Sequence, residues 1–211
     1  MTQHPQNVSF SIHVPDGFMP ITAGLNYNVR SELETRFATM FSISADHVGV
    51  RSIVDLLSEL GVSHHDSGID FSAIGLFRSP DEPDRPVSAL LTCARMAASN
   101  ESNTVTLSGL RELHEREPNS RVMEIEIQAG RCIAVVKEFF QSIPADEDKM
   151  YIVSARQVTV WVPNPDGSSI AVVSIISNSI RDWPNVCDTA LDVFNSIAWE
   201  EIEGFGADAP R

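Results

Sequence analysis

Residues 157–177, QVTVWVPNPDGSSIAVVSIIS, constrain the fold more than any other stretch of this sequence, because they predict a β-hairpin. Two runs rich in β-branched residues flank a Pro-Asn-Pro-Asp-Gly turn, a pattern typical of paired strands. Pro163 and Pro165 lack a backbone N–H, so regular pairing cannot continue past this end of the ladder. The two runs hold no acid, base or nucleophile other than serines, and we therefore expect the hairpin to be core scaffold.

Trp161 stands out within this hairpin because it alternates with valines. Side chains of a strand point to opposite faces in turn, so Trp161 faces away from the side that holds Val160 and Val162. Two interpretations follow. A helix of the same chain covers the indole, or the indole is exposed and anchors a protein partner.

The same kinds of pattern predict the elements along the rest of the chain. Apolar, alternating or β-branched runs predict strands at 8–14, 69–78, 85–98, 122–128, 131–140, 150–163 and 168–177. Helical spacing of apolar residues predicts helices at 29–43, at 49–62 with Gly61 as the stop, at 104–117, and after Pro184. Residues 18–28 are expected to be irregular, and 64–68 and 143–149 to be loops.

This order of elements predicts an α+β fold, in which sequential hairpins form an antiparallel sheet sandwiched by helices. A single domain is expected over residues 1–200, with 18–68 as a helical N-terminal elaboration and 201–211 as an acidic, Gly-rich tail. Residues from 200 onward are expected to fray. The final helix is expected to bury a stripe made of Val186, Ala190, Leu191, Val193, Phe194 and Ile197.

Charge and cysteine content limit the partners of this chain. The net charge of −14 argues against binding to nucleic acid or to anionic lipid, and it suits a basic protein partner. No secretory signal and no apolar run long enough to span a bilayer are recognisable. The three cysteines, Cys93, Cys132 and Cys187, are far apart, which indicates buried thiols in the reducing cytoplasm.

Four segments, IQAGRCIAVV, VTVWVPNPDG, IAVVSIISNS and ALDVFNSIAWE, follow one another in an order and spacing that resemble a pattern from actinobacterial proteins. That pattern is similar to the PsbP-like fold, and the resemblance covers about residues 121–200. It implies a curved antiparallel sheet between helices, and a binding or accessory role rather than an enzymatic one. The chain departs from the pattern at Ile197-Ala198-Trp199, which lacks the family's basic residue before the final aromatic.

One histidine-containing segment is a candidate metal site. His64, His65 and Asp66, with Asp70 nearby and Asp46-His47 upstream, offer nitrogen and oxygen ligands to a divalent cation. Adjacent histidines in a loop are poor co-ligands, and no helical H-x-x-x-H pair supports them. The alternative is a solvated connection between a helix and a strand, so no metal or cofactor is expected.

Other catalytic arrangements have weaker signals. A Cys-His nucleophile would need Cys93 or Cys187 beside His64 or His114, and neither cysteine has the electropositive setting that activates a thiol. The chain has no G-x-S-x-G, G-x-G-x-x-G or P-loop motif. Two carboxylates spaced two residues apart on one strand, at 124 and 126, are typical of a solvated strand face.

The acidic group Asp146, Glu147 and Asp148 is a candidate contact for a basic partner, as is a second acidic group at 81–84. The leading hypothesis is a non-enzymatic, cytoplasmic binding or accessory protein that acts through a protein–protein surface including Trp161. It could be a homodimer, or an immunity or secretion-accessory protein. The alternative is a metal-dependent or small-ligand enzyme that uses the His64/His65/Asp66 segment.

Overall fold

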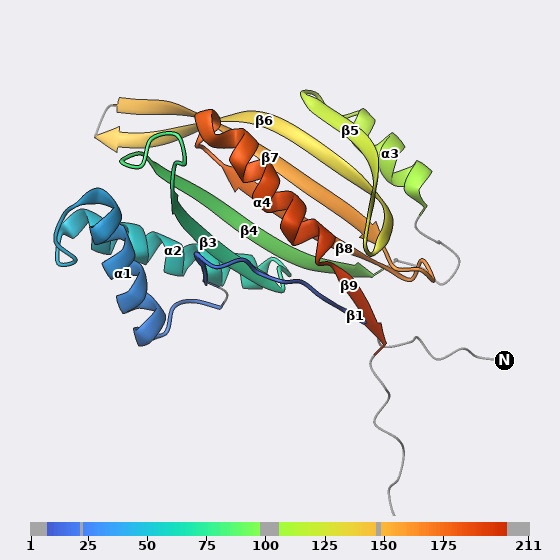
Figure 1. Cartoon of the computed structure of the whole chain (residues 1–211), viewed down its shortest axis with the longest axis horizontal. Coiled ribbons are helices and arrows are strands. Elements are labelled where there is room, and N and C mark those ends of the chain that lie inside the picture. The colour runs from blue at the N-terminus through green and yellow to red at the C-terminus, as the bar shows by residue number, and fades with distance from the viewer. Residues whose placement is uncertain (1–7, 22, 98–105, 147–148, 202–211) are drawn as a thin grey trace, which may run out of the picture.

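The hairpin of residues 157–177 lies inside a seven-stranded antiparallel sheet. The computed structural model describes residues 8–21, 23–97, 106–146 and 149–201 (Figure 1). The strands of the sheet are β2 (Phe18–Pro20), β3 (Phe71–Arg78), β4 (Pro86–Ala97), β5 (Ser120–Ile127), β6 (Gly130–Asp146), β7 (Lys149–Pro163) and β8 (Ser169–Ser177). Their spatial order is β2-β3-β4-β8-β7-β6-β5, so the sheet is open.

Strands β5 to β8 form the predicted meander, and β8 also pairs with β4. The turn of the hairpin closes through the Asn164 backbone N–H, which donates to the Ser169 carbonyl at 2.9 Å. The β7–β8 ladder ends at Pro163, opposite Ile170. The ladder therefore ends at the first of the two prolines, and the predicted hairpin is confirmed.

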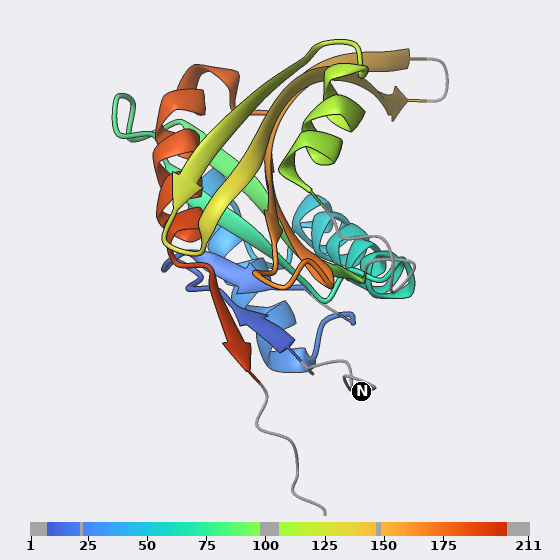
Figure 2. The same ribbon diagram turned by 90° about the vertical axis from the view of Figure 1, so that its right-hand side faces the viewer.

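Helices cover both faces of the sheet, as the α+β prediction requires (Figures 1 and 2). Helix α4 (Trp183–Asn195), preceded by the short 3-10 turn η1 (Ile180–Asp182), packs on one face. Helices α1 (Tyr27–Phe41), α2 (Val48–Asp66) and α3 (Leu107–Glu115) lie on the other. The α4 face holds the main apolar core, a buried cluster that includes Phe194 of α4 together with Val160 of β7 and Val173 of β8.

Residues 200 and 201, which were expected to fray, are instead part of a strand, and the rest of the expected tail, 202–211, lies outside the described residues. Strand β9 (Ala198–Glu201) pairs antiparallel with β1 (Val8–Ser11) to form a separate two-stranded sheet. Phe10 lies opposite Trp199, and their rings meet edge-on with centroids 5.8 Å apart. This pairing orders residues 198–201 because it buries part of two aromatic side chains that sequence patterns alone left unpaired.

Helix α2 is longer than predicted, and Gly61 does not end it. The helix continues to Asp66, so the predicted loop at 64–68 begins with helical residues. Gly61 faces the backbone of Ile21: a Cβ atom at Gly61 would lie 1.6 Å from the Ile21 carbonyl oxygen. The glycine is therefore required for close approach between a helix and a neighbouring chain segment, and the helix ends at Asp66 with Ser67 as its C-cap.

Three smaller predictions also need correction. The irregular segment 18–28 contains strand β2, which adds to the edge of the sheet beside β3. The acidic loop at 143–149 is largely strand, since β6 runs to Asp146 and β7 starts at Lys149. Leu191 is not part of the buried stripe of α4, because 48% of its surface is exposed.

Candidate binding surface

Strands β6 and β7 extend beyond their neighbours as a two-stranded arm. Strand β5 stops pairing with β6 at Lys137, and β8 stops pairing with β7 at Arg156. From there, residues 138–146 and 149–155 pair only with each other among the strands that the structure describes. Figures 1 and 2 both show this arm projecting past the rest of the sheet. Both of its outer edges carry backbone groups that could pair with another chain.

Two large apolar side chains lie exposed on this arm. Phe140 is 72% exposed and Ile152 is 74% exposed. Phe140 is opposite Ser154 and Ser142 is opposite Ile152, so the two apolar residues are diagonal neighbours on one face of the hairpin. This is the face that packs against α4 farther along the sheet, but the arm extends beyond that helix (Figure 1). We call Phe140 and Ile152 the arm pair.

Of the three acidic residues proposed to contact a partner, Asp146 lies at the end of this arm. Asp146 is the last residue of β6 and is opposite Lys149 in the ladder. Glu147 and Asp148 fall outside the described residues. The structure thus places the backbone of Asp146 at the end of the arm.

The second acidic group, at 81–84, belongs to a loop that is fixed to the domain. Arg85 connects this loop to Asp182 at the start of α4, with Nε 3.0 Å from Oδ2. The Ser79 hydroxyl donates to the other carboxylate oxygen at 2.6 Å. Glu82 pairs with Arg85 at 2.7 Å. This loop has a structural role in joining the β3–β4 connection to α4.

Trp161 is half-buried and lies against α3. The centroid of its indole ring is 4.6 Å from that of the His114 imidazole. Trp161 packs against the apolar cluster between α3 and the sheet, and both residues line a cavity there. It faces away from Val160, as predicted, since Val160 lies in the core on the α4 side. The sequence left open whether a helix of the same chain or a protein partner covers the indole. The structure shows α3 of the same chain beside it. A role for Trp161 in partner binding stays a prediction.

The proposed metal ligands do not converge. His64 and His65 are neighbours in the last turn of α2, where successive side chains point about 100° apart. His64 is half-buried and burial lowers the pKa of its imidazole, whereas His65 is exposed. Upstream, His47 caps the start of α2 by accepting from the Gly49 N–H at 3.1 Å. No group of three or more potential ligands gathers anywhere in the described part of the chain.

The cysteines lie in surroundings that keep their thiols protonated. Burial raises the pKa of Cys93 and of Cys132 to about 12, and nearby carboxylates add to the shift. Burial also raises the pKa of Cys187, on α4. Cys93 is part of the α4-side core, while His114 lies on the opposite face of the sheet, so the sheet separates this Cys-His pair.

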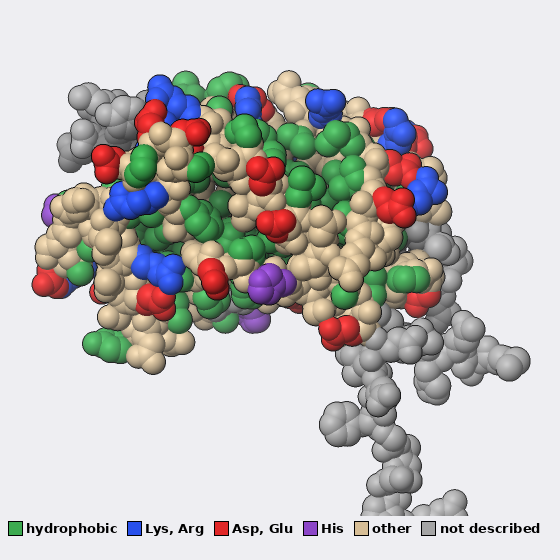
Figure 3. All heavy atoms as spheres, in the orientation of Figure 1, with side chains coloured by type: hydrophobic (Ala, Val, Ile, Leu, Met, Phe, Trp, Pro, Cys, Tyr) green, Lys and Arg blue, Asp and Glu red, His purple; other side chains and the backbone are tan. Residues whose placement is uncertain are grey.

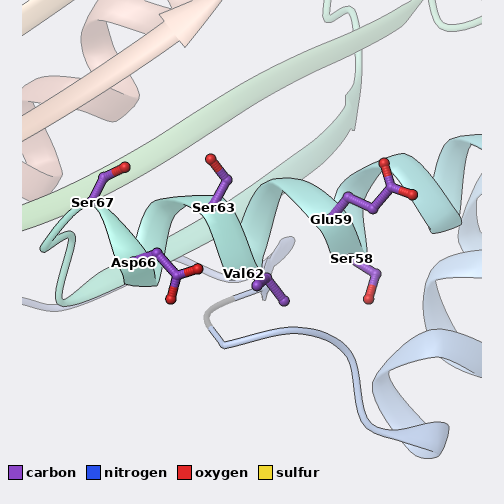
Figure 4. A pocket seen from close by; sticks show the side chains of 6 residues that line it. All are labelled: Ser58, Glu59, Val62, Ser63, Asp66 and Ser67. Atoms are coloured by element: carbon purple, nitrogen blue, oxygen red, sulfur yellow. The ribbon is translucent and has the colours of Figure 1, made fainter.

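The remaining candidates are surface features. Glu124 pairs with Arg131 on the exposed part of the β5–β6 hairpin, and Glu126 is exposed. A groove of about 490 Å³ along α2 is lined by Glu59, Asp66 and other residues of that one helix (Figure 4). In Figure 4, Glu59, Ser63 and Ser67 lie on one side of the helix and Ser58, Val62 and Asp66 on the other, so the six side chains do not converge on one position.

On the α4 side of the molecule, acidic side chains do not form a patch of their own. Figure 3, which views the α4 side, shows basic side chains interspersed with acidic ones around a band of hydrophobic atoms. Several of these charges are paired, as in the Glu138–Arg156 pair at the base of the arm, with Nη2 3.1 Å from Oε2. Attraction to a basic partner would therefore come from the overall field and from the sequence at the arm turn.

Sequence reasoning missed the arm pair. The strand runs around Phe140 and Ile152 were recognised, but their exposure depends on where β5 and β8 stop. A usable signal was present in length, because the predicted strand at 150–163 is longer than the strand at 168–177 that pairs with it. The part of a strand that is longer than its hairpin partner must pair with another strand or extend beyond the sheet.

Taken together, these features define an α+β protein with an open antiparallel sheet, helices on both faces and a projecting two-stranded arm. No protein-family model and no curated protein matches the chain. Among solved structures, it is similar to the crystal structure of LpqN, described as involved in cell envelope biogenesis of Mycobacterium tuberculosis. The two share 7% sequence identity with a TM-score of 0.41, over 93% of this chain and 86% of the LpqN chain.

None of the helices in the described residues is long and apolar enough to cross a bilayer.

Proposed function

We propose that this protein is a non-enzymatic binding or accessory protein that contacts a protein partner through the β6–β7 arm. The observation that carries the proposal is the arm itself, which combines two unpaired strand edges with the exposed arm pair. Exposed apolar side chains beside free backbone donors and acceptors are what β-strand addition by another chain would cover. The scaffold behind the arm is rigid, because β6 and β7 continue into the core.

The partner that fits this surface is a protein with a basic face. The net charge of −14 would speed its approach, and the acidic sequence Asp146-Glu147-Asp148 would add local attraction. A cytoplasmic immunity or secretion-accessory protein is one form of this proposal. The resemblance of residues 121–200 to PsbP-like proteins supports the same accessory role.

Binding is favoured over the enzymatic alternative for a geometric reason. The His64/His65/Asp66 segment is helical and its side chains diverge, and the cysteines have raised pKa values. The groups that a metal-dependent or thiol chemistry would use are therefore not assembled among the described residues. The arm, by contrast, is assembled and accessible.

The test compares an arm variant with a matched surface variant. Phe140→Ser together with Ile152→Ser removes the arm pair, and Leu113→Ser, at 57% exposed on α3, is the control. Proteins captured from native lysate are identified, and the dissociation constant is measured with the purified partner. We expect the arm variant to bind at least about tenfold more weakly, because two exposed apolar contacts are lost. The control should bind like the wild type, with equal melting temperatures for all three proteins.

Equal affinity of the arm variant and the wild type for the partner would contradict the proposal.

Charge reversal by Asp146→Lys and Asp148→Lys should lower the affinity for the partner at low salt and change that affinity little at high salt. Sedimentation velocity of the purified protein distinguishes a second copy of this chain from another protein as the partner. A dimer that becomes a monomer in the arm variant would identify the homodimer form.

A further inference from the structure

A second candidate site lies on the opposite face of the sheet, in a strip between the helices that pack on this face. Helices α1 and α2 pack over one side of this face and α3 over the other, with parts of β4, β8 and β7 between them (Figure 2). A row of hydroxyls crosses this strip in register, since Thr92 is opposite Ser174 and Ser174 is opposite Thr159. Directly opposed residues share a face, so the three hydroxyls lie side by side.

These hydroxyls belong to an ordered network. Gln157 Nε2 donates to Ser174 Oγ at 2.7 Å and to Thr159 Oγ1 at 3.0 Å. Thr159 Oγ1 donates to Ser174 Oγ at 2.9 Å. Ser174 accepts twice and keeps its own proton to donate. The network forms the floor of a cavity of about 210 Å³, whose apolar wall includes Ile69, Val135 and Val172.

Two further lining residues carry buried polar atoms without a partner. His114 is only 4% exposed, and its Nε2 has no hydrogen-bond partner among the described residues. The Nε1 of Trp161, whose ring lies beside that of His114, is also buried and has none within the same part of the chain. A buried polar atom left without a partner is costly, so these two atoms are positions that a hydrogen-bonding molecule in the cavity would complete.

His114 Nε2 and Trp161 Nε1 differ in whether they accept or donate a hydrogen bond. His114 Nδ1 lies 2.9 Å from a carboxylate oxygen of Glu117, and Lys137 pairs with the other oxygen. The hydrogen bond from Lys137 lowers the pKa of Glu117, so this carboxylate is ionised and accepts a hydrogen bond from the Nδ1–H of His114. In the neutral imidazole, Nε2 is then a hydrogen-bond acceptor. Trp161 Nε1 is a donor only.

We propose that this cavity binds a small uncharged molecule through a carboxamide group. The N–H of a carboxamide would donate to His114 Nε2, and its carbonyl oxygen would accept from Trp161 Nε1. Lys137 and Glu117 offset each other, so the site presents no unpaired charge to a ligand. The cavity volume is below the roughly 300 Å³ at which drug-sized pockets begin, which restricts the ligand to a compact molecule.

The test uses benzamide as the probe, with methyl benzoate and toluene for comparison. Methyl benzoate keeps the ring and the carbonyl but lacks the N–H, and toluene lacks both polar groups. The readout is the indole N–H resonance of Trp161 in a nitrogen–proton correlation spectrum, assigned with Trp161→Phe. We expect benzamide to shift this resonance saturably and methyl benzoate to bind about tenfold more weakly, because His114 Nε2 would stay unpaired.

The variant His114→Ala should weaken benzamide binding by about tenfold, whereas His65→Ala, on the exposed side of α2, should not change it. Absence of a saturable shift with benzamide would overturn the proposal. Equal binding of methyl benzoate would also overturn it, since the donor would then play no part. The comparison of probes uses wild-type protein alone, so it decides the question even if His114→Ala fails to fold.

Discussion

Asp182 shows how one buried side chain can hold separate segments together. Its carboxylate is 1% exposed and receives hydrogen bonds from Arg85 and Ser79, which lie about a hundred residues earlier in the chain. The hydrogen bond from Arg85 lowers the pKa of Asp182, with Ser79 contributing, despite the opposing effect of burial. The ionised carboxylate is therefore part of the folded structure.

We expect Asp182→Asn to lower the free energy of unfolding by about 2 kcal/mol at neutral pH, because hydrogen bonds to a charged group are lost. The folded pKa of Asp182 lies below its unfolded value of about 3.9. Its stabilisation is thus complete above that unfolded value and disappears as pH falls toward the folded pKa. Urea denaturation at a series of pH values from neutral to acidic should show the free energies of unfolding of the wild type and Asp182→Asn converging. If the difference between the two free energies stayed constant across this range, the ionised state assigned to Asp182 would be wrong.

The thiols give a second prediction at this scale. Burial raises the pKa of Cys93 and Cys132 to about 12, so almost no thiolate exists at pH 8. A colorimetric disulfide reagent should titrate all three cysteines in denaturant and neither of these two rapidly in the native protein. If native Cys187→Ser still reacted rapidly with the reagent, Cys93 or Cys132 would be accessible, and the prediction would be wrong.

At the scale of elements, the packing of α2 depends on Gly61. The helix lies so close to the segment around Ile21 that a Cβ atom at position 61 would overlap the Ile21 carbonyl oxygen. Leu57 and Leu60 pack beside this contact, against the cluster that holds α1 and α2 to the sheet. A shift of the helix would therefore disturb a whole cluster.

Gly61→Ala should destabilise the protein by about 1–3 kcal/mol, even though alanine favours helix formation, because the helix must move away from Ile21. Ser63→Ala, at an exposed position of the same helix, is the control and should be neutral or slightly stabilising. Thermal unfolding followed by circular dichroism measures both. If Gly61→Ala melted at the same temperature as Ser63→Ala, the close approach of α2 to Ile21 would not contribute to the stability of the protein.

At the scale of the whole molecule, acidic residues outnumber basic ones by 29 to 15. The described ion pairs are mostly at the surface, where each contributes little. Repulsion among the unpaired carboxylates should therefore dominate the response of stability to salt.

We expect the melting temperature to rise by a few degrees when sodium chloride increases from about 10 mM to about 300 mM, as screening weakens this repulsion. Differential scanning calorimetry at pH 7 provides the measurement. A melting temperature that falls over this range would show that the ion pairs outweigh the repulsion.

Local patterns predicted much of the fold and little of the candidate sites. The strands around the 163–167 turn, the parity of Trp161 and the helix after Pro184 all follow from side-chain periodicity over a few residues. The errors at Gly61 and at 198–201 arose where contacts distant in sequence decide the structure. A glycine that ends a helix and one that admits a neighbouring backbone look alike in sequence.

The sequence by itself determined the order of the strands and helices other than β2 and β9, the hairpin at 157–177 and the acidic character of the chain. Only the tertiary structure decided that β6 and β7 project as an arm, since this depends on where their neighbours stop pairing. It also placed Thr92, Thr159 and Ser174 in one row beside His114. The physical reason is that periodicity is a property of a short segment, whereas register and burial are set by which segments meet.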